Sequence, residues 1–299
     1  MKTVMRALLR GYLARSPVTE GKGLLYRAFS TAMLPPEREV IVPLRPGFQM
    51  ALDLSEATQR EIYYFGTYER KESALVRRIL RPGDAFWDVG ANLGYYALLG
   101  SACVGAAGRV VAFEPFPPAW ERLRRNAGLN GFEQIRLVNA AASNLVGTAP
   151  LFFASDVPDG VASLAAPEGH VSQVTCRTVT LDRFAEEDGE RLPTLMKVDV
   201  EGAEKAVLEG AAGILSGSHP PMLLLEMEDE QFGRHGTSKR EIQEMLSRLG
   251  YAAYQLRGRR WVVSDDIREA RFRNIFWAIP TSDPHRARLQ AAGIPQGYA

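Results

Sequence analysis

Two acids and two glycines occupy positions where a buried strand would end and a helix would begin. Asp88, Gly90 and Gly94 form the pattern D-x-G-x-x-x-G, and Glu114 ends the next apolar run, "VVAFE". Glycines at such a turn allow a ligand to approach the backbone closely. An acid at the end of the second strand can accept hydrogen bonds from both hydroxyls of a ribose. The pattern therefore predicts a nucleoside site.

The acid at the first turn narrows the choice of nucleoside. A dinucleotide site typically shows G-x-G-x-x-G, which places a pyrophosphate on the N-terminus of the helix, whereas here Ala91 and Asn92 follow Gly90. Asp88 would repel a pyrophosphate but would suit a cationic or zwitterionic ligand. These features favour S-adenosylmethionine, a nucleoside without phosphates that carries a sulfonium and an amino acid. The glycines alone could also serve only to pack a helix on a strand.

We therefore expect one cofactor site beyond the carboxyl ends of the first strands. Asn139 and Ala141 follow the third predicted strand and are expected to flank the adenine. The predicted cofactor-binding residues are Asp88, Gly90, Ala91, Asn92, Gly94, Glu114, Pro115, Asn139, Ala141 and Asp199.

A second group of acids lies in "TLMKVDVEG" and "MLLLEME". Lys197, Asp199 and Glu201 alternate, so a strand that stayed extended would place them on one side. The family resemblance described below implies that the acceptor is a hydroxyl. A hydroxyl is a poor nucleophile until it loses its proton, so it would need a base, or a metal that lowers its pKa. We predict three catalytic residues, each of which acts as the base or contacts the substrate: Asp199, Glu201 and Glu226.

Each of these side chains also has a structural interpretation. Glu201 could cap the following helix, where an acid is favourable, and Lys197 could hold a carboxylate by a charge-assisted hydrogen bond. Glu226 and Glu228 could join Asp199 around Mg²⁺. An ion-paired or solvated Glu228 is the commoner case, and no metal is predicted.

Four aromatic and acidic side chains near the predicted turn are further candidates. The family resemblance described below implies that Tyr68 and Glu69 could close over the cofactor. Of Tyr95 and Tyr96, which begin the first helix of the core, one is expected to reach the cofactor and the other to pack inside.

A polar segment rich in Gly, Pro and Ser covers residues 155–172, between the strand-like runs "APLFFAS" and "VTCRTVT". It is expected to form either a loop over the pocket or an ordinary solvent loop. His170 in this segment and His235 in "QFGRHGTS" could each act as a base, although a histidine on the surface is the commoner case.

Strand-like and helix-like segments alternate from residue 85 onward. The expected strands are "AFWDV", "RVVAFE", "IRLVNAA", "TLMKVDV" and "PMLLLEM", and the expected helices cover 93–103, 117–129, 203–212 and 238–249. Repeated βα units predict an α/β, doubly wound parallel sheet that binds ligands beyond the carboxyl ends of its strands. Because "AAYQLRGRRWVV" and "FRNIFWAI" have no helix between them, the sheet is expected to finish with an antiparallel strand.

The first residues are basic and amphipathic. Residues 1–29 carry six basic side chains and a single acid. Helical spacing on this segment would suit a membrane surface, a partner protein or the protein's own body, and we favour the body or a partner. The scarcity of acids also leaves a transit peptide open. The apolar residues at helical spacing are Val4, Leu8, Leu9 and Leu13.

Four regions are expected along the chain. Residues 1–35 form the basic helical segment, and 36–83 form a hairpin, "REVIVPL" and "FQMALDL", followed by two helices broken at Gly66. The catalytic core is expected at 84–280 and a tail at 281–299.

Composition excludes several classes of protein. The chain has 36 basic and 35 acidic residues, a net charge of +1, so nucleic acid is not an expected partner. No run of about 18 apolar residues could cross a bilayer, and arginines interrupt any signal peptide. Two cysteines without a metal-binding spacing argue against a disulfide framework or a zinc site. A cytoplasmic location is expected, and the oligomeric state is not indicated.

At this point a family resemblance emerges. The segments "FWDVGANLGYYALL", "VVAFEPFPPAWERLRRNAGLNG", "CRTVTLDRF", "LMKVDVEGAEKAVLEGA" and "MLLLEME" resemble the FkbM-type family of S-adenosylmethionine-dependent methyltransferases. The similarity runs from about residue 66 to 256, and residues 1–35 and 155–172 fall outside it. The resemblance implies a Rossmann-like, seven-stranded class I methyltransferase fold. It also implies in-line methyl transfer to a hydroxyl of a small molecule, often a sugar or natural product.

Other functions remain as alternatives. Methylation of base amino groups usually uses an N/D-P-P-Y/F motif, which "DVEG" replaces, and methylation at cytosine C5 needs a Cys beside Pro, which is absent. A catalytically silent cofactor-binding scaffold and an N-methyltransferase of a small molecule stay open. An NAD-dependent oxidoreductase is disfavoured because G-x-G-x-x-G is missing.

Overall fold

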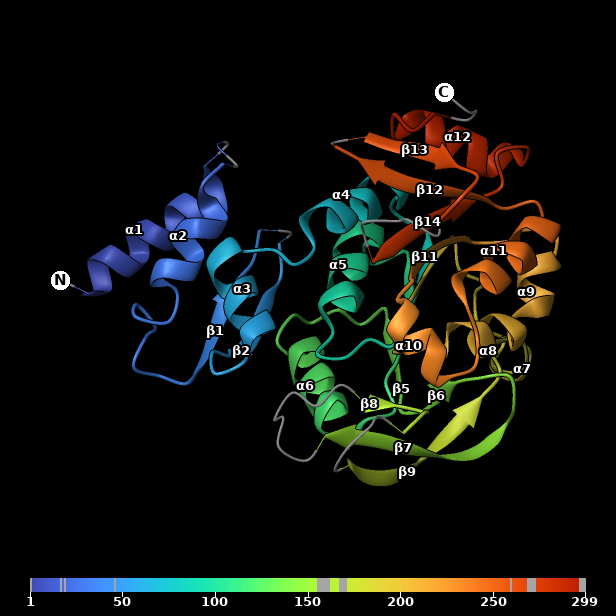
Figure 1. Ribbon diagram of the computed structural model, residues 1–299, viewed down its shortest axis with the longest axis horizontal. Coiled ribbons are helices and arrows are strands. Elements are labelled where there is room, and N and C mark those ends of the chain that lie inside the picture. Colours follow the sequence, from blue (N-terminus) through green and yellow to red (C-terminus); the bar gives the residue numbers. More distant parts are fainter. Residues whose placement is uncertain are drawn as a thin grey trace.

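The computed structural model describes residues 2–16, 18, 20–45, 47–154, 162–166, 171–258, 260–267 and 273–295. Its centre is an eight-stranded sheet with the strand order β13-β12-β14-β11-β10-β3-β4-β5 (Figure 1). The strands are β3 (Ala85–Val89), β4 (Arg109–Phe113), β5 (Ile135–Val138), β10 (Leu195–Val198), β11 (Met222–Glu226), β12 (Ala252–Arg257), β13 (Arg260–Ser264) and β14 (Asn274–Ala278).

The direction of the strands confirms the predicted architecture. β3 is parallel to β4 and β10, and these are parallel to β5 and β11 respectively. β14, the last strand in the chain, runs antiparallel to both β11 and β12. Seven of the strands form the expected doubly wound sheet, and β13 adds an eighth at the edge by pairing antiparallel with β12.

Apolar side chains on both faces explain why the central strands are buried. All five residues of β3 are buried, as expected for a parallel sheet covered on both sides. Phe86 and Leu195 point to the core that contains α4, α5, α6 and α12, whereas Trp87 and Met196 point to the core that contains α7 to α11. The helices are α4 (Arg70–Ile79), α5 (Tyr95–Val104), α6 (Pro117–Gly128), α7 (Leu181–Asp188), α8 (Glu204–Glu209), α9 (Ala212–Ser216), α10 (Asp229–Arg234), α11 (Lys239–Arg248) and α12 (Asp283–Ala291).

Several helices differ from the sequence prediction. The single helix expected at 203–212 is divided into α8 and α9, and three helices were not expected: α7, α10 and α12. The division falls at Gly210, where a Cβ would lie 2.0 Å from the carbonyl oxygen of Ser143. Close packing against a neighbouring segment therefore interrupts a pattern that favours one continuous helix.

A second, four-stranded sheet has the order β6-β9-β7-β8. The predicted strands "APLFFAS" and "VTCRTVT" are confirmed as an antiparallel pair. Most of the polar segment between them, residues 155–161 and 167–170 with His170, lies outside the described residues. The strands are β6 (Ala141–Ala142), β7 (Gly147–Ala154), β8 (Ala162–Ser163) and β9 (Val171–Val179).

The N-terminal elements form one end of the molecule (Figure 1). The predicted hairpin is confirmed as β1 (Glu39–Pro43) paired with β2 (Gln49–Asp53), and Gly66, with φ 66°, separates α3 (Ala57–Phe65) from α4. α1 (Lys2–Arg15) lies on α3, with Leu13 buried, and α2 (Lys22–Phe29) follows it. Among the described residues, no helix is long and apolar enough to span a bilayer.

Candidate active site

A cavity of about 430 Å³ opens where β3, β4, β10 and β11 end. This is the edge at which parallel α/β sheets bind ligands. The predicted site residues that line the cavity are Gly90, Asn92, Glu114, Pro115, Ala141, Asp199, Glu201 and Glu226. The lining does not include Asp88, Ala91, Gly94 or Asn139.

The two glycines of the first turn serve packing more directly than ligand approach. Gly90 has φ 86°, and a Cβ there would lie 1.8 Å from the carbonyl oxygen of Asp199. A Cβ on Gly94 would lie 2.6 Å from Leu123 Cδ1 of α6. The expected close contact is therefore made by the chain itself, and only Gly90 also lines the cavity.

Glu114 is buried at the end of β4 with acceptor capacity to spare. Its Oε2 accepts a hydrogen bond from the Asn92 amide (2.7 Å), and its Oε1 accepts one from the Phe116 amide (2.8 Å). Each carboxylate oxygen has a second lone pair available. Burial raises the pKa of Glu114 to about 7. Asn139 donates to the Glu114 backbone carbonyl (2.8 Å) and so supports this strand end.

Asp88 is the least satisfied acid of the site. It is 1% exposed, and neither carboxylate oxygen accepts a hydrogen bond of good geometry within the described part of the chain, although the nearby Ala97 amide acts to lower its pKa. Burial raises its pKa to about 7, against the opposing effect of nearby Lys197, its neighbour on β10. A buried carboxylate without partners is costly unless a cation or donor completes it.

The buried Lys197 forms an ion pair with the half-buried Asp199, as the sequence suggested. Lys197 Nζ lies 2.6 Å from Asp199 Oδ2 and 4.7 Å from the centre of the Tyr96 ring. Burial disfavours the Lys197 ammonium, but the negative charges of Asp199, Glu69 and Asp88 raise its pKa. Burial would likewise raise the pKa of Asp199, yet Lys197 more than offsets this and holds that pKa below its usual value.

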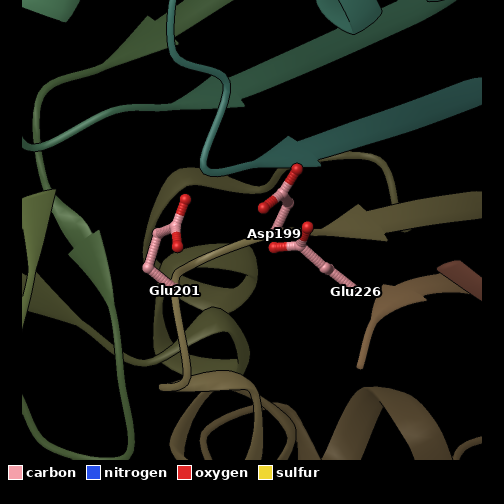
Figure 2. Close-up of side chains that lie close together, drawn as sticks. All are labelled: Asp199, Glu201 and Glu226. Atoms are coloured by element: carbon pink, nitrogen blue, oxygen red, sulfur yellow. The ribbon is translucent and has the colours of Figure 1, made fainter. Parts of the chain in front are cut away.

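Asp199, Glu201 and Glu226 converge, with one oxygen of each within 4.8 Å of the others. Figure 2 shows Asp199 and Glu226 pointing toward one another, with Glu201 standing beside them. Burial and the charge of Asp199 raise the pKa of Glu201 to about 8 and raise that of Glu226 further. Three close carboxylates in a low-dielectric site cannot all ionise without a compensating cation.

The predicted extended run through Glu201 is wrong. β10 ends at Val198, and Glu201 has φ 57°, a left-handed conformation that is rare outside glycine. Its carboxylate accepts a hydrogen bond from the Gln231 side chain. The turn before α8 is closed instead by Glu204, whose Oε1 accepts from the Val200 amide (3.0 Å). Strain of this kind concentrates at functional sites.

Sequence reasoning missed Arg273, which enters the cavity from just before β14. Its Nε lies 3.4 Å from Glu226 Oε1, and its Nη2 pairs with Glu228. The interpretation of Glu228 as an ion-paired acid is thus confirmed. No motif marks Arg273, because it lies far along the chain from the acids that it contacts.

The other candidate residues differ in their access to the cavity. Tyr68 lines it, whereas Glu69 is not part of the lining and its Oε2 accepts a hydrogen bond from the hydroxyl of Tyr96 (2.6 Å). Neither Tyr95 nor Tyr96 is part of the cavity lining, because both are taken up in the core. His235 bonds to Ser163 Oγ (3.0 Å) and also lies outside the lining.

The remaining wall has no chemical motif. Apolar side chains from α6 and the second sheet form one side, and polar residues from before the core form another. These residues include Glu56, Thr58, Phe116, Arg122, Leu151, Ala162 and Leu164. Ala162 and Leu164 belong to the polar segment at 155–172, for which a loop over the pocket and an ordinary solvent loop were both left open.

These residues fit S-adenosylmethionine. Glu114 has free lone pairs for ribose hydroxyls, the apolar wall can hold an adenine, and the buried carboxyl group of Asp88 adds to the acids that line the cavity, where a cation would favour its ionised form. The sheet, with its order and antiparallel β14, together with this cavity defines a class I, Rossmann-like methyltransferase.

The chain matches the model of the FkbM methyltransferase domain over residues 88–253. It therefore belongs to that family, and its cofactor is S-adenosylmethionine.

Named relatives share part of the chain. It is 30% identical to the hexuronic acid methyltransferase AglP of Haloferax volcanii over 49% of this chain and 59% of AglP. It is 27% identical to the methyltransferase sdnD of Sordaria araneosa over 41% of this chain and 58% of sdnD. The structure of an FkbM methyltransferase from Methylobacillus flagellatus covers 74% of this chain and 55% of that chain, with a TM-score of 0.41 and 16% identity. The matches thus span less than two thirds of each of these relatives.

Proposed function

We propose that the protein is an S-adenosylmethionine-dependent O-methyltransferase that acts on a hydroxyl of a small molecule, such as a sugar or natural product. The observation that carries this proposal is the convergence of three carboxylates of different pKa at the cofactor cavity. Groups whose environments separate their pKa values are suited to separate acid and base roles.

We assign the predicted cofactor contacts as follows. Glu114 accepts the ribose hydroxyls, and Pro115, Asn92 and Ala141 line the nucleoside part of the cavity. Asp88 and Asp199 provide negative charge for the amino-acid end, with Gly90 holding the two strand ends together. Ala91, Gly94 and Asn139 support this arrangement from behind, since they do not line the cavity.

Glu201 is the proposed base. When bound, S-adenosylmethionine supplies a methyl group on a positively charged sulfur, which is a good leaving group. Glu201 would accept the proton of the acceptor hydroxyl whose oxygen takes this methyl group, with the cofactor sulfur as the leaving group. Its pKa of about 8 lies near working pH, where general bases are most effective. The demethylated cofactor and the methyl ether are the products.

The neighbouring acids position the acceptor. Asp199 stays ionised beside Lys197, and Glu226 stays protonated because of burial and the charge of Asp199. A protonated Glu226 can donate a hydrogen bond to a second oxygen of the acceptor. In-line alignment by such contacts can supply much of the rate acceleration. The name of AglP makes sugar acids the first acceptors to examine.

Substitution of Glu201 by Gln tests the proposal. We expect turnover with a sugar-acid acceptor to fall by about 10²- to 10⁴-fold, while binding of S-adenosylhomocysteine changes little. In the unsubstituted protein, kcat/KM should rise with pH through about 8, because the base must be ionised. Glu244→Gln, on an exposed glutamate paired with Arg240, is the matched control. Binding without methyl transfer to any sugar, natural product or amine would instead favour the silent scaffold.

The same variant distinguishes an N-methyltransferase from an O-methyltransferase. An amine already deprotonated needs no base, so Glu201→Gln would leave its methylation nearly unchanged. Mass spectrometry of the labelled product identifies the atom that receives the methyl group.

A further inference from the structure

The exposed apolar side chains of this protein are concentrated at its N-terminal end. Twelve large apolar residues are exposed in the described part of the chain, and eight of them lie between residues 4 and 29. Val4, Leu8 and Leu24 are 63%, 64% and 71% exposed. The eight residues, here termed the apolar face, are Val4, Met5, Leu8, Tyr12, Val18, Leu24, Leu25 and Phe29.

This face is not the side by which the helices pack on the protein. Leu13 of α1 is 1% exposed, and Arg10 Nε donates to the Tyr63 carbonyl of α3 (3.0 Å). The buried Lys22 of α2 donates to the carbonyls of Leu13 (2.7 Å) and Ser16 (2.8 Å), which ties the two helices together. α1 and α2 therefore have a fixed inner side and an outer side that no described residue covers.

On the outer side, the exposed apolar residues have the spacing of a helix that lies flat on an apolar surface. Val4, Leu8 and Tyr12 recur every fourth residue along α1, and Leu25 and Phe29 do so on α2. Such spacing gives one apolar row along each helix. The two helices lie side by side at the end of the molecule (Figure 1).

The charges around the apolar face are basic. Neither helix contains an acid, and three basic side chains of these helices, Lys2, Arg15 and Arg27, are exposed, with Glu20 the one acid between the helices. If two copies of the chain paired through their apolar faces, their basic side chains would be brought together, which is unfavourable. An anionic surface would be attracted, and basic residues flanking an apolar stripe are typical of helices in a membrane interface.

We propose that the apolar face binds the surface of a membrane containing anionic lipids. At 14 residues, α1 is too short to cross a bilayer, so it lies in the plane of the interface with its stripe inserted among the acyl chains. The exposed basic side chains contact lipid phosphates. This role is independent of methyl transfer, because the cofactor cavity contains no residue of α1 or α2.

Vesicle sedimentation tests the proposal with the full chain. The unsubstituted protein should sediment with vesicles of phosphatidylcholine and phosphatidylglycerol, and only weakly with phosphatidylcholine alone. The double variant Leu8→Glu, Leu24→Glu should bind the anionic vesicles at least tenfold more weakly. The matched control is Leu145→Glu, Leu192→Glu, at residues 72% and 43% exposed elsewhere, and it should bind as the unsubstituted protein does.

Three results would overturn the proposal. The first is no binding of the unsubstituted protein to anionic vesicles, and the second is equal loss in the control variant. The third is a dimer in sedimentation velocity that Leu8→Glu, Leu24→Glu dissociates without vesicle binding by either form, which would make the face a contact between copies. Because both changes are at exposed sites, equal melting temperatures verify folding. S-adenosylhomocysteine affinity should be unchanged, so failure here leaves the proposed function untouched.

Discussion

At the scale of single residues, the site is organised by how each acid is prevented from carrying an isolated buried charge. Asp199 is neutralised by Lys197, whereas Asp88 and Glu114 avoid the cost by pKa values raised to about 7. A bound cationic ligand should lower the raised pKa values of Asp88 and Glu114, because a nearby positive charge favours the ionised carboxylate. The charge of the bound ligand and the protonation of Asp88 and Glu114 are therefore linked.

This linkage predicts a pH dependence of cofactor binding. Binding of S-adenosylmethionine should lower the raised pKa values of Asp88 and Glu114 and release protons, so affinity should increase as pH rises through about 7. The slope approaches about tenfold per pH unit for each proton released. Titration calorimetry in buffers of different ionisation enthalpy measures both quantities. Uncharged adenosine is the control and should show a shallower dependence; equal slopes for both ligands would contradict the linkage.

The three converging carboxylates raise the question of a metal, and their neighbours argue against one. Lys197 Nζ lies 2.6 Å from Asp199, and Arg273 lies 3.4 Å from Glu226, so two fixed cations already occupy the surroundings. Mg²⁺ prefers several ionised oxygen ligands in open octahedral geometry. We expect methyl transfer to be unaffected by EDTA and unaffected by added Mg²⁺. Loss of turnover with EDTA that Mg²⁺ restores would contradict this.

At the scale of elements, the turn after β3 depends on its glycine. A Cβ at Gly90 would lie 1.8 Å from the Asp199 carbonyl, and φ 86° is itself unfavourable for other residues. Gly90→Ala should therefore lower the free energy of unfolding and weaken S-adenosylhomocysteine binding. Gly83→Ala is the matched control, because Gly83 has φ 87° with no atom within 4 Å of the Cβ position.

The two variants share the conformational cost of about 1 to 2 kcal/mol and differ in the clash. Gly90→Ala should cost about 1 to 3 kcal/mol more, as measured by chemical denaturation. Equal losses in the two variants would show that the neighbouring strand end moves aside freely.

The elements also show how far the sequence could predict this structure. β3 and the parallel arrangement of the central sheet follow from apolar runs that alternate with helices, because burial on both faces leaves a continuous signal. Asp199 and Glu114 could be placed because each follows a strand directly. The sequence could not predict that Arg273 belongs to the site or that the helix is divided at Gly210, because both features depend on contacts between distant segments.

At the scale of the whole molecule, the family match at 88–253 is smaller than the unit that builds the site. Glu56, Thr58 and Tyr68 line the cavity but precede the match. Arg288 of α12, which follows it, forms a bidentate pair with Asp84 (2.7 Å for each hydrogen bond) at the start of β3. Residues before the matched region therefore form one wall of the cavity, and a helix after it stabilises the start of β3.

A fragment beginning at residue 84 should accordingly fail to fold. It lacks α4, whose Leu75, Val76 and Ile79 are at most 1% exposed. Burial of three such side chains contributes about 4 to 9 kcal/mol, which is comparable to the whole stability of a typical domain. We expect residues 84–299 to show no cooperative thermal transition and no binding of S-adenosylhomocysteine, with the full chain measured alongside. A fragment that melts cooperatively and binds the ligand would show that residues 36–83 are an appendage to the core, because the cavity would then be complete without their wall.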